Sequence, residues 1–236
     1  MIKMNSNVKG AVSIFIAFLL MLILDSCSDK PQKNQIPKEV ETVISAVGDE
    51  KNNDTKTILF FGNSLTAGMG LDPNVAFPAL IQLKIDSLSL NYQVINSGLS
   101  GETTASGKNR LNWVLNQQVD IFVLELGAND GLRGISLDET EKNLQLIIDR
   151  VKAHNPQVVI VLSGMQIPPN LGIEYTRRFQ LIFPELAKRN DIPLIPFLLK
   201  DVAGNKDLNQ PDGIHPTKEG HIIVAENVWE VLKNNL

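Results

Sequence analysis

The stretch TILFFGNSLTAG, residues 57–68, begins with five strand-like residues and passes directly into Gly62, Asn63 and Ser64. Its apolar run TILFF does not alternate with polar residues, which is typical of a strand buried on both faces of a parallel sheet. A serine at the end of such a strand is either a turn residue or an activated nucleophile. The stretch therefore predicts a buried strand followed by a loop in which Ser64 is a candidate for chemistry.

Four more short apolar runs follow, at residues 92–96, 121–126, 157–163 and 192–197. Segments with helical spacing lie between and after them, at residues 78–88, 103–116, 137–154, 175–190 and 217–235. Repeated strand-then-helix order implies right-handed crossovers and helices on both faces of one sheet. The pattern predicts a three-layer α/β/α sandwich with a five-stranded parallel sheet, in which Pro184 should kink or divide its helix.

The N-terminus has the features of an export signal. Its apolar run, residues 11–24, is shorter than the roughly 20 residues of a transmembrane helix and follows two lysines. Cys27, the only cysteine of the chain, lies just after this run in a sequence that resembles a bacterial lipobox, although Asp25 is unusual there. We expect residues 1–27 to be a lipoprotein signal peptide, Cys27 to be lipidated, and the protein to be exported to the cell envelope, on the periplasmic side or at the outer membrane. An uncleaved membrane anchor is the alternative.

The rest of the chain divides into a tether and one domain. Residues 28–56 are rich in Lys, Asn, Glu, Asp and Pro and predict a flexible linker. Residues 57–236 are sufficient for one well-buried core. The formal net charge is −4, which disfavours a nucleic-acid partner. The sequence does not predict an oligomeric state.

Glycine-bearing loops follow the first three predicted strands, in GNSLTAG, SGLSGET and LGANDGLRG. The carboxyl ends of parallel strands meet at one edge of a sheet, where ligands bind in such folds. Taken singly, each loop is an ordinary turn. Together they predict that three loops able to present backbone N–H groups converge on one edge of the sheet.

A fourth loop, QPDGIHPTKEG at residues 210–220, carries Asp212 and His215. A serine hydroxyl becomes a good nucleophile when a neutral imidazole accepts its proton, and a carboxylate on the other ring nitrogen fixes the imidazole. Asp212 precedes His215 by one tight turn and suits that role. His221, in the first turns of the last helix, is the alternative base, whereas His154 at a helix end is expected to be structural or solvated.

The blocks GNSLTAG, SGLSGET, LGAND and DGIHP, in this order, resemble those of the SGNH, or GDSL, hydrolase family, and a G-x-S-x-G elbow is absent. The resemblance covers residues 57–236 and implies a flavodoxin-like sheet. It implies Ser64 as nucleophile, His215 as general base and Asp212 as its orienting acid. It also implies an oxyanion hole formed by the backbone N–H groups of Ser64 and Gly98 and by the side-chain amide of Asn129.

Further matches, such as AFPALIQLKID and LELGANDGLRG, resemble the family's branch of arylesterases, thioesterases and lysophospholipases. Two positions depart from the pattern. Asn63 replaces the usual aspartate before the serine, which should retune the site without abolishing it. Leu171 stands where an aromatic residue is common, so the acyl-chain preference is left open.

The resemblance implies a serine esterase that hydrolyses aryl esters, acyl thioesters or lysophospholipids, with no metal and no organic cofactor. Apolar side chains near the predicted crevice would suit an acyl chain, with ordinary packing as the alternative: Leu132, Ile135, Ile167 and Leu171. The alternatives are a carbohydrate acetyl esterase of the same fold and a non-catalytic protein that binds lipid or glycan. Glycoside hydrolysis by Asp130 and Glu125 is disfavoured, because Glu125 lies inside an apolar strand, where a structural hydrogen-bonding role is expected.

Overall fold

The computed structural model describes residues 55–236. Its centre is a parallel sheet of five strands in the order β2-β1-β3-β4-β5. The strands are β1 Lys56–Gly62, β2 Tyr92–Gly98, β3 Ile121–Glu125, β4 Val159–Ser163 and β5 Leu194–Ile195. This order confirms the flavodoxin-like topology, and strand order reverses beside β1.

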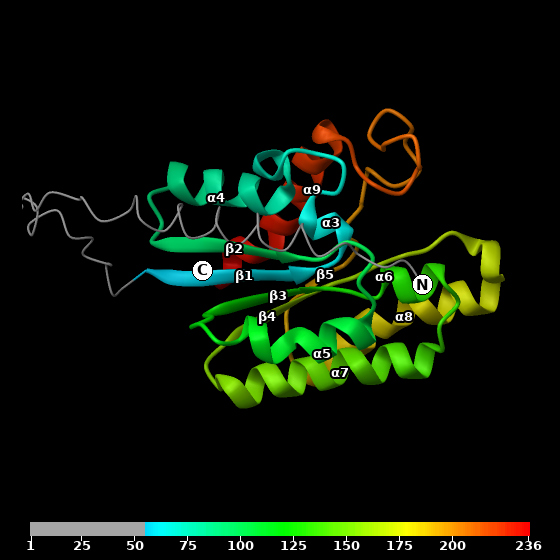
Figure 1. The fold of residues 1–236 in the computed structure, drawn as a ribbon, viewed down its shortest axis with the longest axis horizontal. Coiled ribbons are helices and arrows are strands. Elements are labelled where there is room, and N and C mark those ends of the chain that lie inside the picture. The colour runs from blue at the N-terminus through cyan, green and yellow to red at the C-terminus, as the bar shows by residue number, and fades with distance from the viewer. Residues whose placement is uncertain (1–54) are drawn as a thin grey trace, which may run out of the picture. The chain divides into compact units, whose positions relative to one another are not determined.

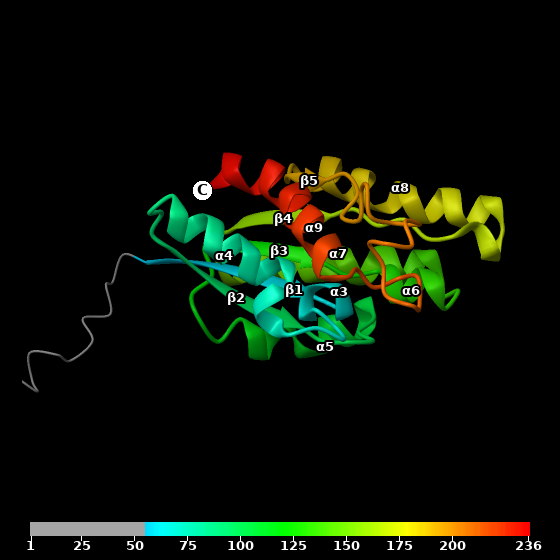
Figure 2. The same cartoon turned by 90° about the horizontal axis from the view of Figure 1, so that it is seen from above.

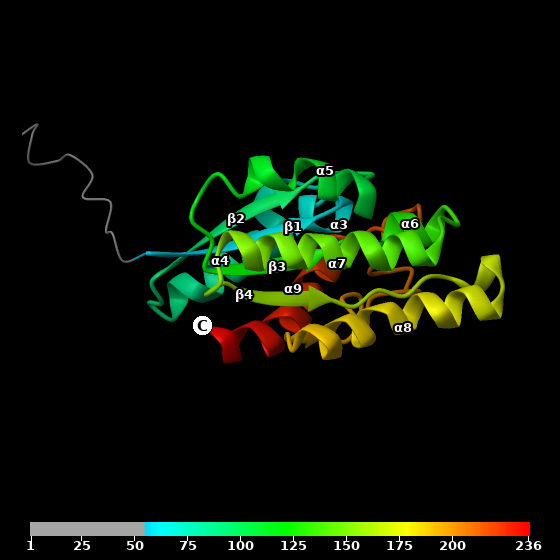
Figure 3. The same ribbon diagram turned by 90° about the horizontal axis from the view of Figure 1, so that it is seen from below.

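Helices cover both faces of the sheet, as Figure 1 shows. Helices α4 and α9 lie on one face, seen in front of the sheet in Figure 2, and α5, α7 and α8 lie on the other face, seen in front in Figure 3. The long helices are α4 Phe77–Ser87, α5 Thr104–Val114, α7 Leu137–His154, α8 Ile173–Asn190 and α9 Lys218–Leu232. The three-layer sandwich expected from the sequence is therefore confirmed.

Burial explains why the central strands lack alternation. Ile58, Leu59, Phe60 and Phe61 of β1 are all 0% exposed, because helices cover both faces of this strand. Strand β3 is likewise buried throughout. Only β5 is much shorter than its apolar run at residues 192–197 suggested.

Helix α8 contains Pro184 and is not divided by it. The proline removes one backbone N–H and frees the carbonyl of Gln180 one turn earlier. Both residues are on the exposed side of the helix, where water can satisfy the freed carbonyl. Of the two outcomes expected at Pro184, a kink or a division of the helix, the division does not occur.

Short helices follow the strands at the edge where the carboxyl ends meet. They are α3 Ser64–Ala67 and α6 Ala128–Leu132. Elsewhere, three 3-10 turns adjoin the long helices: η1 Pro73–Val75 precedes α4, η2 Pro169–Leu171 precedes α8 and η3 Lys233–Asn235 follows α9. Helices α3 and α6 begin directly after β1 and β3, so they bring Ser64 and Asn129 to neighbouring positions of the sheet edge.

The predicted signal peptide, Cys27 and nearly all of the predicted linker lie outside the described residues. Within residues 55–236, no helix combines the length and the apolarity needed to cross a membrane.

Candidate active site

Ser64 lies at the start of α3, immediately after β1 ends. Asn63 caps this short helix, because its side-chain oxygen accepts the N–H of Leu65 at 2.9 Å. The first N–H groups of a helix have no partner within the helix, so the N–H of Ser64 is available to a ligand. Ser64 is 8% exposed and lines a cavity.

His215 and Asp212 complete a chain of contacts to Ser64. The Nε2 atom of His215 lies 2.8 Å from Ser64 Oγ, and its Nδ1 atom lies 2.6 Å from Asp212 Oδ2. An ionised carboxylate only accepts, so Nδ1 carries the proton and Nε2 is left to accept from the serine hydroxyl. The three side chains expected from the sequence are thus adjacent, although Ser64 and His215 are 151 residues apart.

Asp212 is fixed by its own loop. Its Oδ1 atom accepts the N–H groups of Ile214 and His215, each at 3.0 Å. Partial burial acts to raise the pKa of Asp212, but these N–H groups and the His215 ring outweigh it and lower the pKa to about 2. Asp212 therefore stays ionised at neutral and mildly acidic pH.

The other two histidines do not reach Ser64. His221 accepts the backbone N–H of Phe77 on Nδ1 at 3.2 Å and stacks on the Phe77 ring. Burial, with a smaller effect of His215, lowers the pKa of His221 to about 4, so its ring is neutral. Through these contacts His221, which belongs to α9, packs against the first residue of α4 and is not placed to act as the alternative base. His154 is exposed in the last turn of α7.

The structure assigns different positions to the three groups expected in the oxyanion hole. Ser64 and Asn129 line the cavity, but Gly98 does not. The N–H of Gly98 donates to Asn96 Oδ1 at 2.9 Å, and a Cβ on Gly98 would lie 2.2 Å from the backbone nitrogen of Ala67. Gly98 is thus required by close packing against α3, and its expected role as a donor was wrong.

Gly101, the second glycine of SGLSGET, lines the cavity in its place. Among the described residues its backbone N–H has no hydrogen-bond acceptor. Asn129 donates one side-chain N–H to the carbonyl of Glu102 at 3.0 Å, and an amide has a second N–H to offer. The sequence signal for Gly101 was its place in the same loop as Gly98.

The cavity beside Ser64 has a volume of about 670 Å³. Of the four apolar side chains expected there, Leu132 and Ile167 line it, whereas Ile135 and Leu171 do not. Sequence reasoning missed further apolar side chains of its wall: Met69, Met165, Phe197, Leu199 and Ile214. Phe197 and Leu199 follow β5, so their place at the end of the fifth apolar run was the available signal. The wall suits an apolar ligand.

Asn63, which departs from the usual aspartate, is paired with the buried Glu125. Its Nδ2 atom donates to Glu125 Oε1 at 2.7 Å and its backbone N–H donates to Oε2 at 3.1 Å. Thr66 Oγ1 donates to the same Oε2 at 2.8 Å. An aspartate at residue 63 would place its carboxylate within hydrogen-bond distance of the Glu125 carboxylate, and the two charges would repel. The amide of Asn63 avoids this like-charge contact.

No paired-carboxylate site results from Glu125 and Asp130. Glu125 is held by Asn63 and Thr66, whereas Asp130 accepts the N–H and the hydroxyl of Thr104 at 2.9 and 2.6 Å. Both carboxylates are 1% exposed and serve structural contacts. In the described part of the chain, no three His, Cys, Asp or Glu side chains gather in a way that could hold a metal ion.

Comparisons with known proteins identify the family of the chain. Residues 60–223 match the sequence profile of the GDSL-like Lipase/Acylhydrolase family. The chain is 39% identical over 171 residues to Thioesterase 1/protease 1/lysophospholipase L1 of Escherichia coli strain K12, covering 72% of this chain and 80% of that protein. It is 35% identical over 179 residues to Esterase TesA of Pseudomonas aeruginosa, covering 75% and 88%. The crystal structure of TesA matches with a TM-score of 0.73 at 35% identity, covering 77% of this chain and 100% of that one.

Glu125→Gln should change the pH dependence of stability. Burial raises the pKa of Glu125 from 4.5 to about 7, despite the hydrogen bonds from Thr66 and Asn63. Between these values the folded state keeps a proton that the unfolded state releases, so the free energy of unfolding of the wild type falls as pH rises. The free energy of unfolding of the variant does not fall in this way. Relative to the wild type, it should increase by up to about 1.4 kcal/mol per pH unit between pH 4.5 and about 7.

Urea unfolding of both proteins at several pH values from 4 to 8 measures this difference, with the exposed Glu185→Gln as the baseline for the same chemical change. A difference between Glu125→Gln and wild type that does not vary with pH would contradict the assignment.

Proposed function

The chain belongs to the GDSL-like lipase/acylhydrolase family and is an ester-hydrolysing enzyme, and we propose that Ser64, His215 and Asp212 are its catalytic triad. The observation that carries the proposal is the continuous contact from Ser64 Oγ to His215 Nε2 at 2.8 Å and from Nδ1 to Asp212 at 2.6 Å. This is the arrangement in which a general base and its orienting acid activate a serine.

In the first half-reaction, His215 Nε2 takes the hydroxyl proton while Ser64 Oγ attacks the ester carbonyl. The tetrahedral intermediate collapses when the C–O bond to the alcohol breaks and His215 returns the proton to the leaving oxygen. In the second half-reaction, His215 takes a proton from water, the resulting hydroxide attacks the acyl-enzyme, and Ser64 leaves with that proton. Asp212 stabilises the imidazolium in both steps.

Three donors are proposed for the negative oxygen of the intermediate: the N–H of Ser64, the N–H of Gly101 and the side-chain amide of Asn129. Their positions on the cavity wall and their free hydrogens support this set. Fixed donors of this kind act where charge develops, and one is typically worth about 3 kcal/mol of transition-state stabilisation.

Esters and thioesters with an extended acyl chain are the proposed substrates, which include aryl esters, acyl thioesters and lysophospholipids. The apolar cavity wall supports this choice, with Leu132, Met165 and Ile167 among its residues. A carbohydrate acetyl esterase would not need apolar space of about 670 Å³ beside its serine. A non-catalytic binding protein would not need the triad contacts.

Turnover of p-nitrophenyl esters from acetyl to palmitoyl should peak beyond acetyl. Each buried CH₂ contributes about 0.8 kcal/mol, so three or four buried groups should raise kcat/KM by more than about 50-fold. Ser64→Ala should abolish the activity. A peak at acetyl would indicate the carbohydrate esterase, and equal rates for Ser64→Ala and wild type would overturn the enzyme mechanism.

Paired variants localise the acyl site. Leu132→Trp should move the optimum to shorter chains because Leu132 lines the cavity, whereas Leu171→Trp should leave the optimum unchanged because Leu171 does not.

Asp212→Asn should lower kcat by about 10³- to 10⁴-fold with little change in KM, because an amide no longer fixes the Nδ1 tautomer. Because the pKa of Asp212 is lowered to about 2, its charge, and with it the difference in kcat between the variant and the wild type, should persist from pH 4 to 9. Stopped-assay measurements of kcat from pH 4 to 9 check both statements. A variant that retained wild-type kcat would exclude Asp212 from the triad.

We also propose that residues 1–27 direct export and that Cys27 carries a lipid anchor on the periplasmic side or at the outer membrane. Residues 28–56 then tether the hydrolase domain, residues 57–236, to the membrane. The apolar run at residues 11–24 and the single cysteine that follows it support the proposal. Lys56, the last residue of this tether, is also the first residue of β1, so the tether leads directly into the sheet.

Cys27→Ala should release the activity from the membrane fraction, since the lipid is the proposed attachment. Fractionation of cells that express either protein, with esterase activity as the readout, measures this. Wild-type activity should require detergent for extraction. Retention of the variant in the membrane fraction would instead favour an uncleaved anchor.

A further inference from the structure

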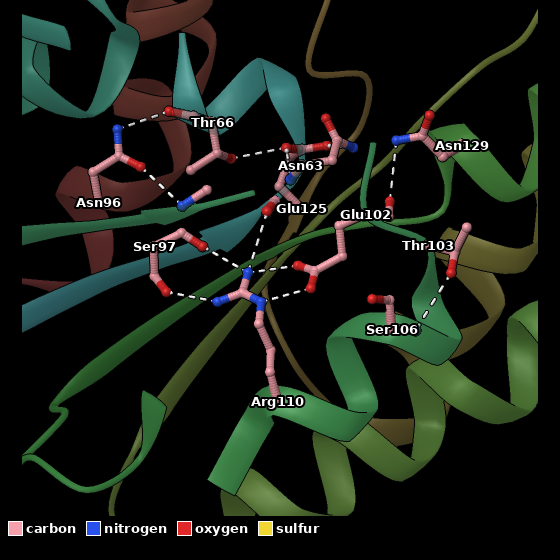
Figure 4. A network of polar contacts seen from close by, with 12 residues as sticks. Asn63, Thr66, Asn96, Ser97, Glu102, Thr103, Ser106, Arg110, Glu125 and Asn129 are labelled. Atoms are coloured by element: carbon pink, nitrogen blue, oxygen red, sulfur yellow. Dashed lines mark hydrogen bonds and ion pairs between the residues drawn. The ribbon is translucent and has the colours of Figure 1, made fainter. Parts of the chain in front are cut away.

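One guanidinium joins three segments at the carboxyl ends of β1 and β2, as Figure 4 shows. Arg110 on α5 donates to the carbonyl oxygens of Ser97 at 2.8 Å and of Gly62 at 3.4 Å. It donates to Ser97 Oγ at 2.9 Å and to the two carboxylate oxygens of Glu102 at 2.6 and 2.5 Å. Arg110 therefore ties the strand that leads to Ser64 to the loop that follows β2.

This ion pair is held on all sides. The side chain of Glu102 is 0% exposed and that of Arg110 is 19% exposed. The guanidinium carbon of Arg110 lies 4.1 Å from the centre of the Phe61 ring, which fixes the plane of the fork. The side chains of an exposed ion pair are mobile. The guanidinium of Arg110, in contrast, is held by β1, by β2 and by the Phe61 ring. The planar fork of arginine makes these contacts at once, which an ammonium group cannot do.

The main chain of Glu102 forms part of the proposed oxyanion site. Its carbonyl oxygen accepts the side-chain N–H of Asn129 at 3.0 Å. The preceding residue, Gly101, lines the cavity and has a free backbone N–H. Glu102, whose carboxylate is bound by Arg110, thus sets the position of two of the three proposed donors, the N–H of Gly101 and the amide of Asn129.

We infer that Arg110 and Glu102 are positioning residues that hold the oxyanion loop, residues 99–103, against the end of β1. The inference rests on the proposed acyl-transfer function. Neither side chain lines the cavity, so neither contributes to substrate binding. Loss of the clamp moves donors that act in the transition state, which lowers kcat and leaves KM nearly unchanged.

The test is steady-state hydrolysis of a p-nitrophenyl ester by Arg110→Lys in the full chain. The ammonium keeps the charge and loses the fork, so kcat should fall about 10- to 100-fold while KM stays within about threefold. The matched control is Arg189→Lys, which weakens an ion pair with Glu141 on the surface between α8 and α7. The control should keep wild-type kcat. Wild-type kcat in Arg110→Lys, or a change confined to KM, would overturn the inference.

Loss of folded protein is separated from loss of positioning by counting active sites. A fluorophosphonate titrated to completion gives the number of reactive serines, and kcat is expressed per site. A merely structural role would reduce the number of sites and keep kcat per site, which would overturn the inference. The double variant Glu102→Gln with Arg110→Gln leaves no unpaired buried charge, so it should fold and still show the lower kcat per site.

Chemical rescue gives an independent readout. Guanidinium chloride at millimolar concentration should restore part of the kcat of Arg110→Ala and should not raise that of the wild type or of Arg189→Lys. An absence of rescue in folded Arg110→Ala would count against the clamp. Ser64→Ala distinguishes failure of the proposed acyl-transfer function from failure of the Arg110 and Glu102 clamp. If it is active, the proposed function fails, and if it is inactive while Arg110→Lys keeps its kcat, only the clamp fails.

Discussion

The buried carboxylate of Glu125 determines how the chain turns from β1 into α3. It accepts the backbone N–H and the side-chain amide of Asn63, which precedes Ser64, and the hydroxyl of Thr66, two residues after Ser64. A helix of only four residues has little stability of its own, so these side-chain bonds replace the missing helical ones. A Cβ on Gly62 would lie 2.5 Å from Glu125 Oε2, so the turn and its anchor also require glycine there. The position of the candidate nucleophile follows from this one contact set.

The sheet order brings the remaining parts of the site to that turn. Strand β1 lies between β2 and β3, so the loops after all three strands meet where the strand order reverses. The loop with Asp212 and His215 reaches the same edge from the far end of the chain. Gln210 holds it there, donating to the carbonyl of Met69 at 2.8 Å, in the loop that follows α3. The segment formed by α3 and the loop after it therefore carries Ser64 and also holds the loop that carries His215.

The sequence allowed the five strands, the five long helices and the contact of Ser64, His215 and Asp212 to be predicted, because buried apolar runs and the spacing of Asp212 and His215 are local signals. It did not distinguish Gly98 from Gly101, since both occur in one loop and only the packing against Ala67 separates them. It placed Leu171 and Ile135 at the crevice, whereas the wall is completed by Phe197, Leu199 and other residues of distant segments. Such contacts depend on the path of long loops, which no local pattern encodes. That α8 continues through Pro184 could not be predicted either, because it depends on Pro184 and Gln180 lying on the side of the helix that faces water.

Two buried carboxylates support the site in different ways, and the difference follows from their partners. Glu125 is surrounded by neutral donors, so its charge is poorly compensated and burial raises its pKa to about 7. Glu102 is paired with the guanidinium of Arg110, which supplies a full compensating charge. An aspartate at residue 63 would add a second carboxyl group beside Glu125, so one of the two would have to hold a proton. The amide of Asn63 instead donates to Glu125 in either protonation state, and the turn around Ser64 keeps its hydrogen bonds without a shared proton.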